Sequence, residues 1–188
     1  DPSYDVIIEP FAGSAAYSLY GNHWQKQVIL VEKDPRVASL WEWLIHTATP
    51  QDLTNLPDLM VGEKTSNFLH ILHAATKMAF QYKTIKTTPV LARNWEISKR
   101  QMAANLYKVK HWTILCGDYS EAPSLEATWF IDPPYRYDSG TGYQYGSNHL
   151  DDQKLAHWSL QRPGEIIRCE GEGGDYLPFQ SLIISKGV

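Results

Sequence analysis

The segment of this sequence that most clearly suggests chemistry is Asp132-Pro133-Pro134-Tyr135, in which two prolines separate an acid from an aromatic residue. Because proline has no backbone N–H, the carbonyl groups here and the Asp132 carboxylate act only as hydrogen-bond acceptors. Such acceptors suit an amino group on an aromatic ring, since they draw its nitrogen toward tetrahedral geometry and orient its lone pair. Tyr135 adds a face on which a base can stack. The segment predicts either a site that activates an aromatic amine or a purely structural turn.

Three further acidic residues stand where predicted strands end: Glu9, Glu32 and Asp118. Parallel strands have their carboxyl ends at one edge of a sheet, which is where open α/β folds bind ligands. A carboxylate after the second strand commonly binds the hydroxyl groups of a ribose. Glu9 also precedes the turn Pro10-Phe11-Ala12-Gly13, whose composition suits a strand that turns sharply into a helix. One such acid is more often a helix cap, but four acids at strand ends favour a nucleoside-binding edge.

The elements that must position these acids alternate between short apolar strands and helices. Strands are expected at residues 5–9, 27–31, 111–116, 127–131, 165–169 and 182–185, and helices at 14–20, 34–45 and 151–160. Asp34 is a favourable helix cap, and Pro35 follows it at the first helical position. We therefore expect an α/β fold with a mostly parallel sheet that helices cover on both faces.

Residues 47–110 interrupt this alternation with scattered prolines and with helical patterns around 68–80 and 97–107. They are expected to form a helical insertion in one domain made of residues 1–46 and 111–188. Residues 77–110 hold eight lysines and arginines and a single glutamate, a net charge of +7 in a chain whose net charge is −4. This asymmetry favours either a face that binds a polyanion or an ordinary solvated helix surface.

Composition excludes several other classes of protein. The chain has 188 residues, of which 43% are apolar and 20% are charged, which suits one soluble domain with a real core. No apolar run approaches the ~20 residues that cross a membrane. The two cysteines, Cys116 and Cys169, and the lack of a signal-peptide pattern at the start favour a reducing, cytoplasmic location. No metal site is expected, because His70 and His73 have no further ligand beside them.

Three stretches resemble a known family: residues 8–19 (IEPFAGSAAYSL), 127–135 (ATWFIDPPY) and 169–179 (CEGEGGDYLPF). Together with Glu32, they are similar to the Dam-type (D12 class) DNA adenine-N6 methyltransferases, especially members from phages and prophages. In that class the cofactor motif precedes the catalytic motif, and a recognition segment lies between them. The resemblance covers most of the chain. Its Asp-Pro-Pro-Tyr motif is specific, whereas its glycine turn is common.

The resemblance implies the Rossmann-like fold of methyltransferases that use S-adenosylmethionine, with transfer of a methyl group to N6 of adenine in DNA. The base would be flipped into the Asp-Pro-Pro-Tyr pocket, because N6 is paired inside the duplex. In this family pattern, Phe11 to Ser14 shape the methionine end of the cofactor pocket, Glu32 holds the ribose hydroxyls, and Asp118 binds the amino group of the cofactor's adenine.

The resemblance also gives the expected site residues. Those expected to bind the cofactor are Glu9, Pro10, Phe11, Ala12, Gly13, Ser14, Glu32, Lys33, Asp118 and Tyr119. Those expected to act on the target base are Asp132, Pro133, Pro134 and Tyr135. Those expected to bind DNA, in the recognition segment, are Lys83, Lys86, Arg93, Lys99 and Arg100. The expected location is the cytoplasm of a bacterium or a phage-infected host cell, with oligomeric state and any restriction partner left open.

Two departures from the family pattern keep alternatives open. Ala15 stands where the family often has a second glycine, which is tolerable if its φ is negative. The family's amino-terminal Gly-Ser/Gly-Lys motif would precede Glu9, and the eight residues there do not contain it. One alternative is a methyltransferase that acts on RNA or on a protein amide. Another is a non-catalytic nucleic-acid-binding module that keeps the fold.

Cys116 is a poor candidate nucleophile, because it falls in a strand expected to be buried.

Overall fold

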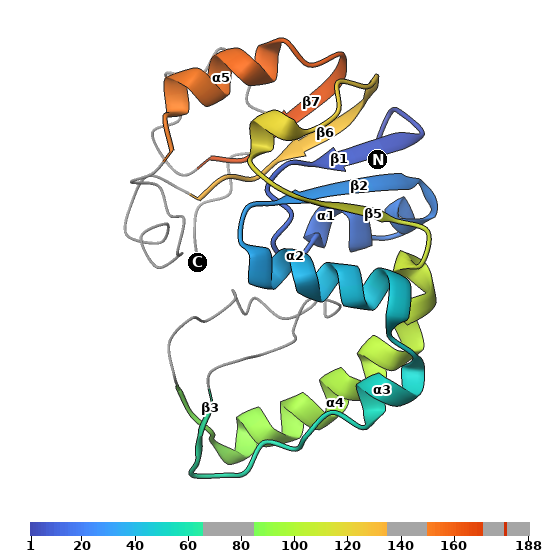
Figure 1. The fold of residues 1–188 in the computed structure, drawn as a ribbon, viewed down its shortest axis with the longest axis vertical. Helices are drawn as coiled ribbons and strands as arrows, with labels where there is room; N and C mark the ends of the chain where they lie inside the picture. Colours follow the sequence, from blue (N-terminus) through green and yellow to red (C-terminus); the bar gives the residue numbers. More distant parts are fainter. Residues whose placement is uncertain (66–84, 135–149, 171–178, 180–188) are drawn as a thin grey trace.

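The computed structural model describes residues 1–65, 85–134, 150–170 and 179. Its main element is a five-stranded sheet of order β5-β2-β1-β6-β7, in which all neighbouring strands run parallel (Figure 1). The strands are β1 (Val6–Glu9), β2 (Gln27–Glu32), β5 (Thr113–Cys116), β6 (Ala127–Ile131) and β7 (Gly164–Arg168). The predicted α/β class and parallel sheet are therefore confirmed, and each of these strands lies within two residues of its predicted position.

The helices alternate with these strands along the chain. They are α1 (Ala16–Leu19), α2 (Pro35–Glu42), α3 (Pro50–Thr54), α4 (Pro89–Asn105) and α5 (Asp152–Leu160). Short turns of other helix types are η1 (His23–Gln25), η2 (Trp43–Thr47), η3 (Leu106–Val109) and η4 (Tyr119–Glu121). As predicted, Asp34 caps α2: its side chain accepts a hydrogen bond from the backbone N–H of Arg36, with Pro35 at the first helical position.

Apolar side chains cover the sheet on both faces, as the sequence predicts. On one face, Ile7 and Leu30 of the sheet pack with Trp41 of α2 and Met102 of α4 in one cluster. On the other face, a second cluster joins Ile8, Ile29, Val31, Trp129 and Ile131 of the sheet to Tyr119 of η4 and Leu155 of α5. Figure 1 shows α2 and α5 on opposite sides of the sheet.

The strand order places a change of direction at the centre of the sheet. The chain runs outward from β1 through β2 to β5, then crosses back to β6 beside β1 and continues to β7. Parallel α/β sheets bind ligands outside the carboxyl ends of the two strands at such a switch point. Here those strands are β1, which ends at Glu9, and β6, which leads directly into Asp132. The order is consistent with a Rossmann-like fold.

The described part of the 47–110 segment contains α3, α4 and an antiparallel pair, β3 (Lys64–Thr65) and β4 (Ile85–Lys86), which the sequence did not predict. Because Leu91, Trp95 and Met102 of α4 belong to the same cluster as Trp41, this segment shares the core of the sheet. The helix predicted around 68–80 and the strand predicted at 182–185 lie outside the described residues. In the described ranges, no helix has both the length and the apolar character needed to cross a bilayer.

The expectation that Cys116 lies in a buried strand is wrong. β5 is an edge strand of the sheet, and both Leu115 and Cys116 are exposed. The physical reason is the short connection from β5 to β6, whose only helical element is the three-residue turn η4, too short to cover the outer part of β5.

Candidate functional site at the carboxyl edge of the sheet

The turn after β1 is held in place by bonds from the neighbouring elements. The backbone N–H of Ala12 donates to the carbonyl of Val31 in β2 at 3.0 Å, and Trp41 Nε1 of α2 donates to the carbonyl of Gly13 at 2.9 Å. Gly13 has φ +44°, a left-handed conformation that glycine adopts without strain. A side-chain carbon there would meet no atom of the described residues within 4 Å, so in this part of the structure the turn faces open space above Gly13.

Ala15 departs from the expected backbone geometry: its φ is +49°, not negative, and its side chain is fully buried. The turn runs through two left-handed residues before α1 begins, and only the first of them is a glycine. A left-handed alanine costs about 1–2 kcal/mol, so the turn carries strain that a glycine at this position would not have.

Replacing Ala15 by glycine is expected to leave the free energy of unfolding unchanged or to raise it. The variant loses a buried methyl group worth about 0.8 kcal/mol but relieves left-handed strain of about 1–2 kcal/mol. Ala38→Gly in α2 is the matched control, since Ala38 is also buried but helical, and it should lose about 2 kcal/mol. Urea unfolding measures both. Equal losses in the two variants would contradict the strained geometry of Ala15.

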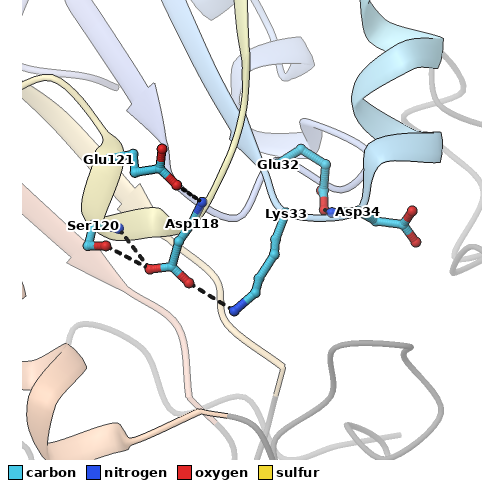
Figure 2. Close-up of polar contacts among 6 residues, drawn as sticks. All are labelled: Glu32, Lys33, Asp34, Asp118, Ser120 and Glu121. Carbon is cyan, nitrogen blue, oxygen red and sulfur yellow. Dashed lines mark hydrogen bonds and ion pairs between the residues drawn. The ribbon is translucent and has the colours of Figure 1, made fainter.

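Glu32 joins the loops that follow β1 and β2. Its Oε2 accepts a hydrogen bond from the backbone N–H of Gly13 at 2.9 Å. Its Oε1 accepts one from the backbone N–H of Asp34 at 2.8 Å (Figure 2). Burial raises the pKa of Glu32, and these backbone bonds oppose the rise. Each carboxylate oxygen has two lone pairs, so Glu32 can hold both backbone groups and still accept from ligand hydroxyls.

Asp118 joins the loops that follow β5 and β2. Lys33 Nζ donates to Asp118 Oδ2 at 2.9 Å, while Asp118 Oδ1 accepts from the backbone N–H and hydroxyl of Ser120 (Figure 2). Partial burial raises the pKa of Asp118, but the bonds from Lys33 and Ser120 outweigh it and lower the pKa overall. Asp118 also caps η4 together with Glu121, which accepts from the Asp118 N–H at 2.7 Å. It is therefore both a helix cap and an ionised group at the site edge.

Two aromatic rings join the turn after β1 to the loop after β5. Phe11 stacks on Tyr119, with ring centroids 5.4 Å apart and an angle of 24° between the planes. Tyr119 also meets Trp158 of α5 edge to face at 5.0 Å, and burial raises the pKa of its hydroxyl. Phe11 itself is half-buried. Of the remaining turn residues, Pro10 and Ala12 are buried and Ser14 is exposed.

The loop after β6 begins with Asp132, which is exposed, followed by buried Pro133 and half-buried Pro134. Tyr135 lies outside the described residues. Next to this loop, the backbone N–H of Cys169 donates to the carbonyl of Ile131 at 2.9 Å, continuing the β6–β7 pairing. Burial, then the charges of Asp132 and Glu9, raise the pKa of the Cys169 thiol to about 12. The thiol is thus a neutral neighbour of the acids. Sequence reasoning gave it no role, although it follows β7 as Asp132 follows β6.

Glu9 lies at the end of β1 and is only 2% exposed. Its Oε1 accepts a hydrogen bond from the backbone N–H of Ser18 at 2.8 Å. Burial raises the pKa of Glu9 to about 7, the Ser18 bonds oppose the rise, and the nearby Asp132 carboxylate adds to it. Glu9 and Asp132 thus form a pair of interacting acids, one buried and one exposed, at the switch point of the sheet.

The structure removes Lys99 from the expected DNA-binding residues. Its side chain is 5% exposed, and its Nζ donates to the carbonyl of Leu56 and to Asp58. The same Nζ forms an ion pair with Glu96 at 2.6 Å. Burial lowers the pKa of Lys99, but the two carboxylates raise it on balance, so the lysine stays charged. Lys99 therefore fixes residues 56–58 to α4 and has no free donor directed at a polyanion. Sequence reasoning missed the two acids that bind it.

Arg93 and Arg100 are exposed on one face of α4, seven residues apart. Between them on the same face lies Ile97, 43% exposed, and Val90 at the start of the helix is 68% exposed. Within the described part of the chain, neither arginine has a hydrogen bond or an ion pair. Lys86, in β4 just before this helix, is also exposed. Lys83 lies outside the described residues. This arginine face, defined by Val90, Arg93, Ile97 and Arg100, is available to a partner.

The chain was compared with models of protein families and with curated proteins, and neither comparison found a match. The functional assignment therefore depends on the geometry of this edge and on the motifs in the sequence.

Proposed function

We propose that this chain is a DNA methyltransferase of the Dam type (D12 class), with the fold of that family, which transfers a methyl group from S-adenosylmethionine to N6 of adenine. One observation carries the proposal. The Gly13 turn, Glu32 and Asp118 share a sheet edge with Asp132-Pro133-Pro134, and this edge lies at the strand-order switch where α/β folds bind ligands.

The residues at this edge fit the proposed cofactor. Gly13 leaves open space above the turn, and Glu32 is fixed by two backbone N–H groups with lone pairs left for ribose hydroxyls. Asp118 is ionised and accepts hydrogen bonds, as contact with an adenine amino group requires. When bound, the cofactor supplies an electrophilic methyl group on a sulfonium.

The loop after β6 fits an aromatic amine as acceptor. Asp132 is exposed and can accept one N–H of the target amine, and the carbonyl of Pro133 can accept the other. Two such bonds hold the nitrogen with its lone pair directed at the methyl group, and the amine loses its surplus proton easily after alkylation. The target must be extruded from its stack to reach this loop, which is the known solution for chemistry on a paired base.

The arginine face of α4 is the part of the described structure best suited to DNA. Two arginines without a partner among the described residues can neutralise phosphates, while Ile97 between them and Val90 before them offer apolar contact. α4 begins on the side of the molecule where the strands of the main sheet end (Figure 1). A duplex on this face therefore extends toward the proposed active edge.

Reversing the charge of Arg93 and Arg100 to glutamate is expected to weaken DNA binding and to flatten its salt dependence. Each lost phosphate contact lowers the slope of log affinity against log salt by about 0.9. Lys154→Glu on α5 is the matched control, because it changes the same charge on another exposed helix position. Fluorescence anisotropy at several salt concentrations measures the slope. If the double variant keeps the wild-type slope, this face does not bind DNA.

Calorimetric titration with S-adenosylmethionine, with and without a DNA duplex, tests whether the edge binds this cofactor. We expect saturable binding of one cofactor per chain. DNA binding without any cofactor binding would support the non-catalytic module instead and would contradict the proposed function.

A further inference from the structure

Glu9 is a buried acid with no cation beside it among the described residues. Its only hydrogen-bond partner in the described structure is Ser18, through the backbone N–H at 2.8 Å, and no lysine, arginine or histidine of the described residues lies within ion-pair distance of it. The residue is 2% exposed, so bulk solvent does not hydrate its carboxylate. A buried carboxylate in such surroundings is strongly disfavoured, and the usual outcome is that the carboxyl group keeps its proton.

The groups that face Glu9 do not supply positive charge either. Asp132 approaches from the loop after β6, Cys169 from the loop after β7, and Tyr17 and Ser18 from α1. Burial raises the pKa of both the Cys169 thiol and the Tyr17 hydroxyl to about 12, so both are neutral at physiological pH. The Asp132 carboxylate is the charged group of this set, and its charge raises the pKa of Glu9 further.

Burial decides which of the two acids keeps a proton. Asp132 is exposed, so water stabilises its carboxylate, whereas Glu9 is enclosed by the sheet and α1. When two neighbouring acids lie in such different environments, their pKa values move apart, and the pair carries one charge and one proton. Without a bound cation, the Glu9 carboxyl therefore keeps a proton, and a cation that binds nearby can displace it.

We propose that Glu9 is protonated in the resting protein, and that binding of a cationic cofactor at this edge releases its proton. The second half of this inference rests on the proposed function, because S-adenosylmethionine carries a sulfonium and an ammonium group and would bind beside the turn after β1. A positive charge a few ångströms away favours the ionised form of a buried acid. Glu9 thus recognises the charge of the cofactor, and binding becomes tighter as the pH rises through about 7.

The protonation of Glu9 is tested in the protein without any cofactor. A carboxyl group whose pKa is raised from 4.5 to about 7 by folding stabilises the fold fully below pH 4.5, and this contribution is lost as the pH rises through about 7. Relative to Glu9→Gln, whose amide mimics the neutral acid, the wild-type equilibrium constant for unfolding should rise roughly 10²–10³-fold between pH 4.5 and pH 8. The control Glu126→Gln, at an exposed acid, should follow the wild type. A wild type that runs parallel to Glu9→Gln over this range would overturn the inference.

The release is tested by calorimetry of S-adenosylmethionine binding in buffers of different ionisation enthalpy. For the wild type we expect close to one proton released per bound cofactor at pH 6 and almost none above pH 8. The Glu9→Gln variant should lack this release at pH 6. Cofactor binding with equal proton release in both proteins would overturn the inference and leave the proposed function intact. Absence of cofactor binding in both would overturn the proposed function, while the unfolding experiment still reports whether Glu9 carries its proton.

Discussion

Replacement of Asp132 by alanine is expected to lower the rate of methyl transfer by about 10²–10⁴-fold while the protein stays folded. Asp132 is exposed and follows the last residue of β6, so it contributes little to either apolar cluster. Its carboxylate is the charged acceptor proposed to orient the target amine, and the variant removes that acceptor from the transition state. A methyl-transfer assay at saturating cofactor measures the loss, and a urea unfolding curve checks the fold.

Two further variants make this test specific. Asp132→Asn keeps the shape of the side chain but removes its charge, so it should also be strongly impaired. Asp5→Ala is the matched control, because Asp5 is an exposed acid just before the opposite end of β1, and its activity should equal that of the wild type. An Asp132→Ala protein with wild-type turnover would show that this loop does not act on the target amine.

Replacement of Glu32 by alanine is expected to weaken cofactor binding by about 10²-fold and to reduce the free energy of unfolding by about 1–3 kcal/mol. Both effects have one cause. Glu32 accepts from the backbone N–H groups of Gly13 and Asp34, so its loss leaves these donors without their acceptor and loosens the turn that borders the cofactor site. The contacts proposed with the ribose hydroxyls are lost as well.

Glu32→Gln separates the two contributions. A glutamine keeps one carbonyl oxygen but places an NH₂ group opposite one of the two backbone donors, so it should lie between alanine and the wild type in both measurements. Glu42→Ala, at an exposed acid of α2, is the matched control and should change neither. Calorimetry measures the dissociation constant, and a value for Glu32→Ala equal to that of the wild type would remove Glu32 from the cofactor site.

Much of the sheet was predictable because local patterns specify it. The apolar runs at β1, β2 and β6 are bounded by acidic residues, and the pair Asp34-Pro35 marks the start of α2. The positions of Glu9, Glu32, Asp118 and Asp132 at one edge follow directly from those boundaries, because parallel strands end on the same side. Thus, the residue types and their order were sufficient to predict this edge.

The details that sequence reasoning got wrong depend on contacts between distant residues. The burial of Lys99 results from Leu56 and Asp58, which lie 43 and 41 positions earlier in the chain and carry no local signal of pairing. The exposure of Cys116 depends on which strand forms the edge of the sheet. The left-handed Ala15 and the burial of Glu9 arise where β1, the turn and α1 meet, and only the assembled structure specifies that geometry.

The central claim is that this edge transfers a methyl group to a base, and transfer of a labelled methyl group tests it most directly. The protein is incubated with S-adenosylmethionine labelled on its methyl group and with unmethylated DNA or RNA in parallel, and the digested products are identified by mass. We expect the label on DNA adenine as N6-methyladenine, at a level that falls with Asp132→Ala. Label on RNA alone would show that the protein methylates RNA and not DNA. Cofactor binding with no label on either nucleic acid would contradict the claim.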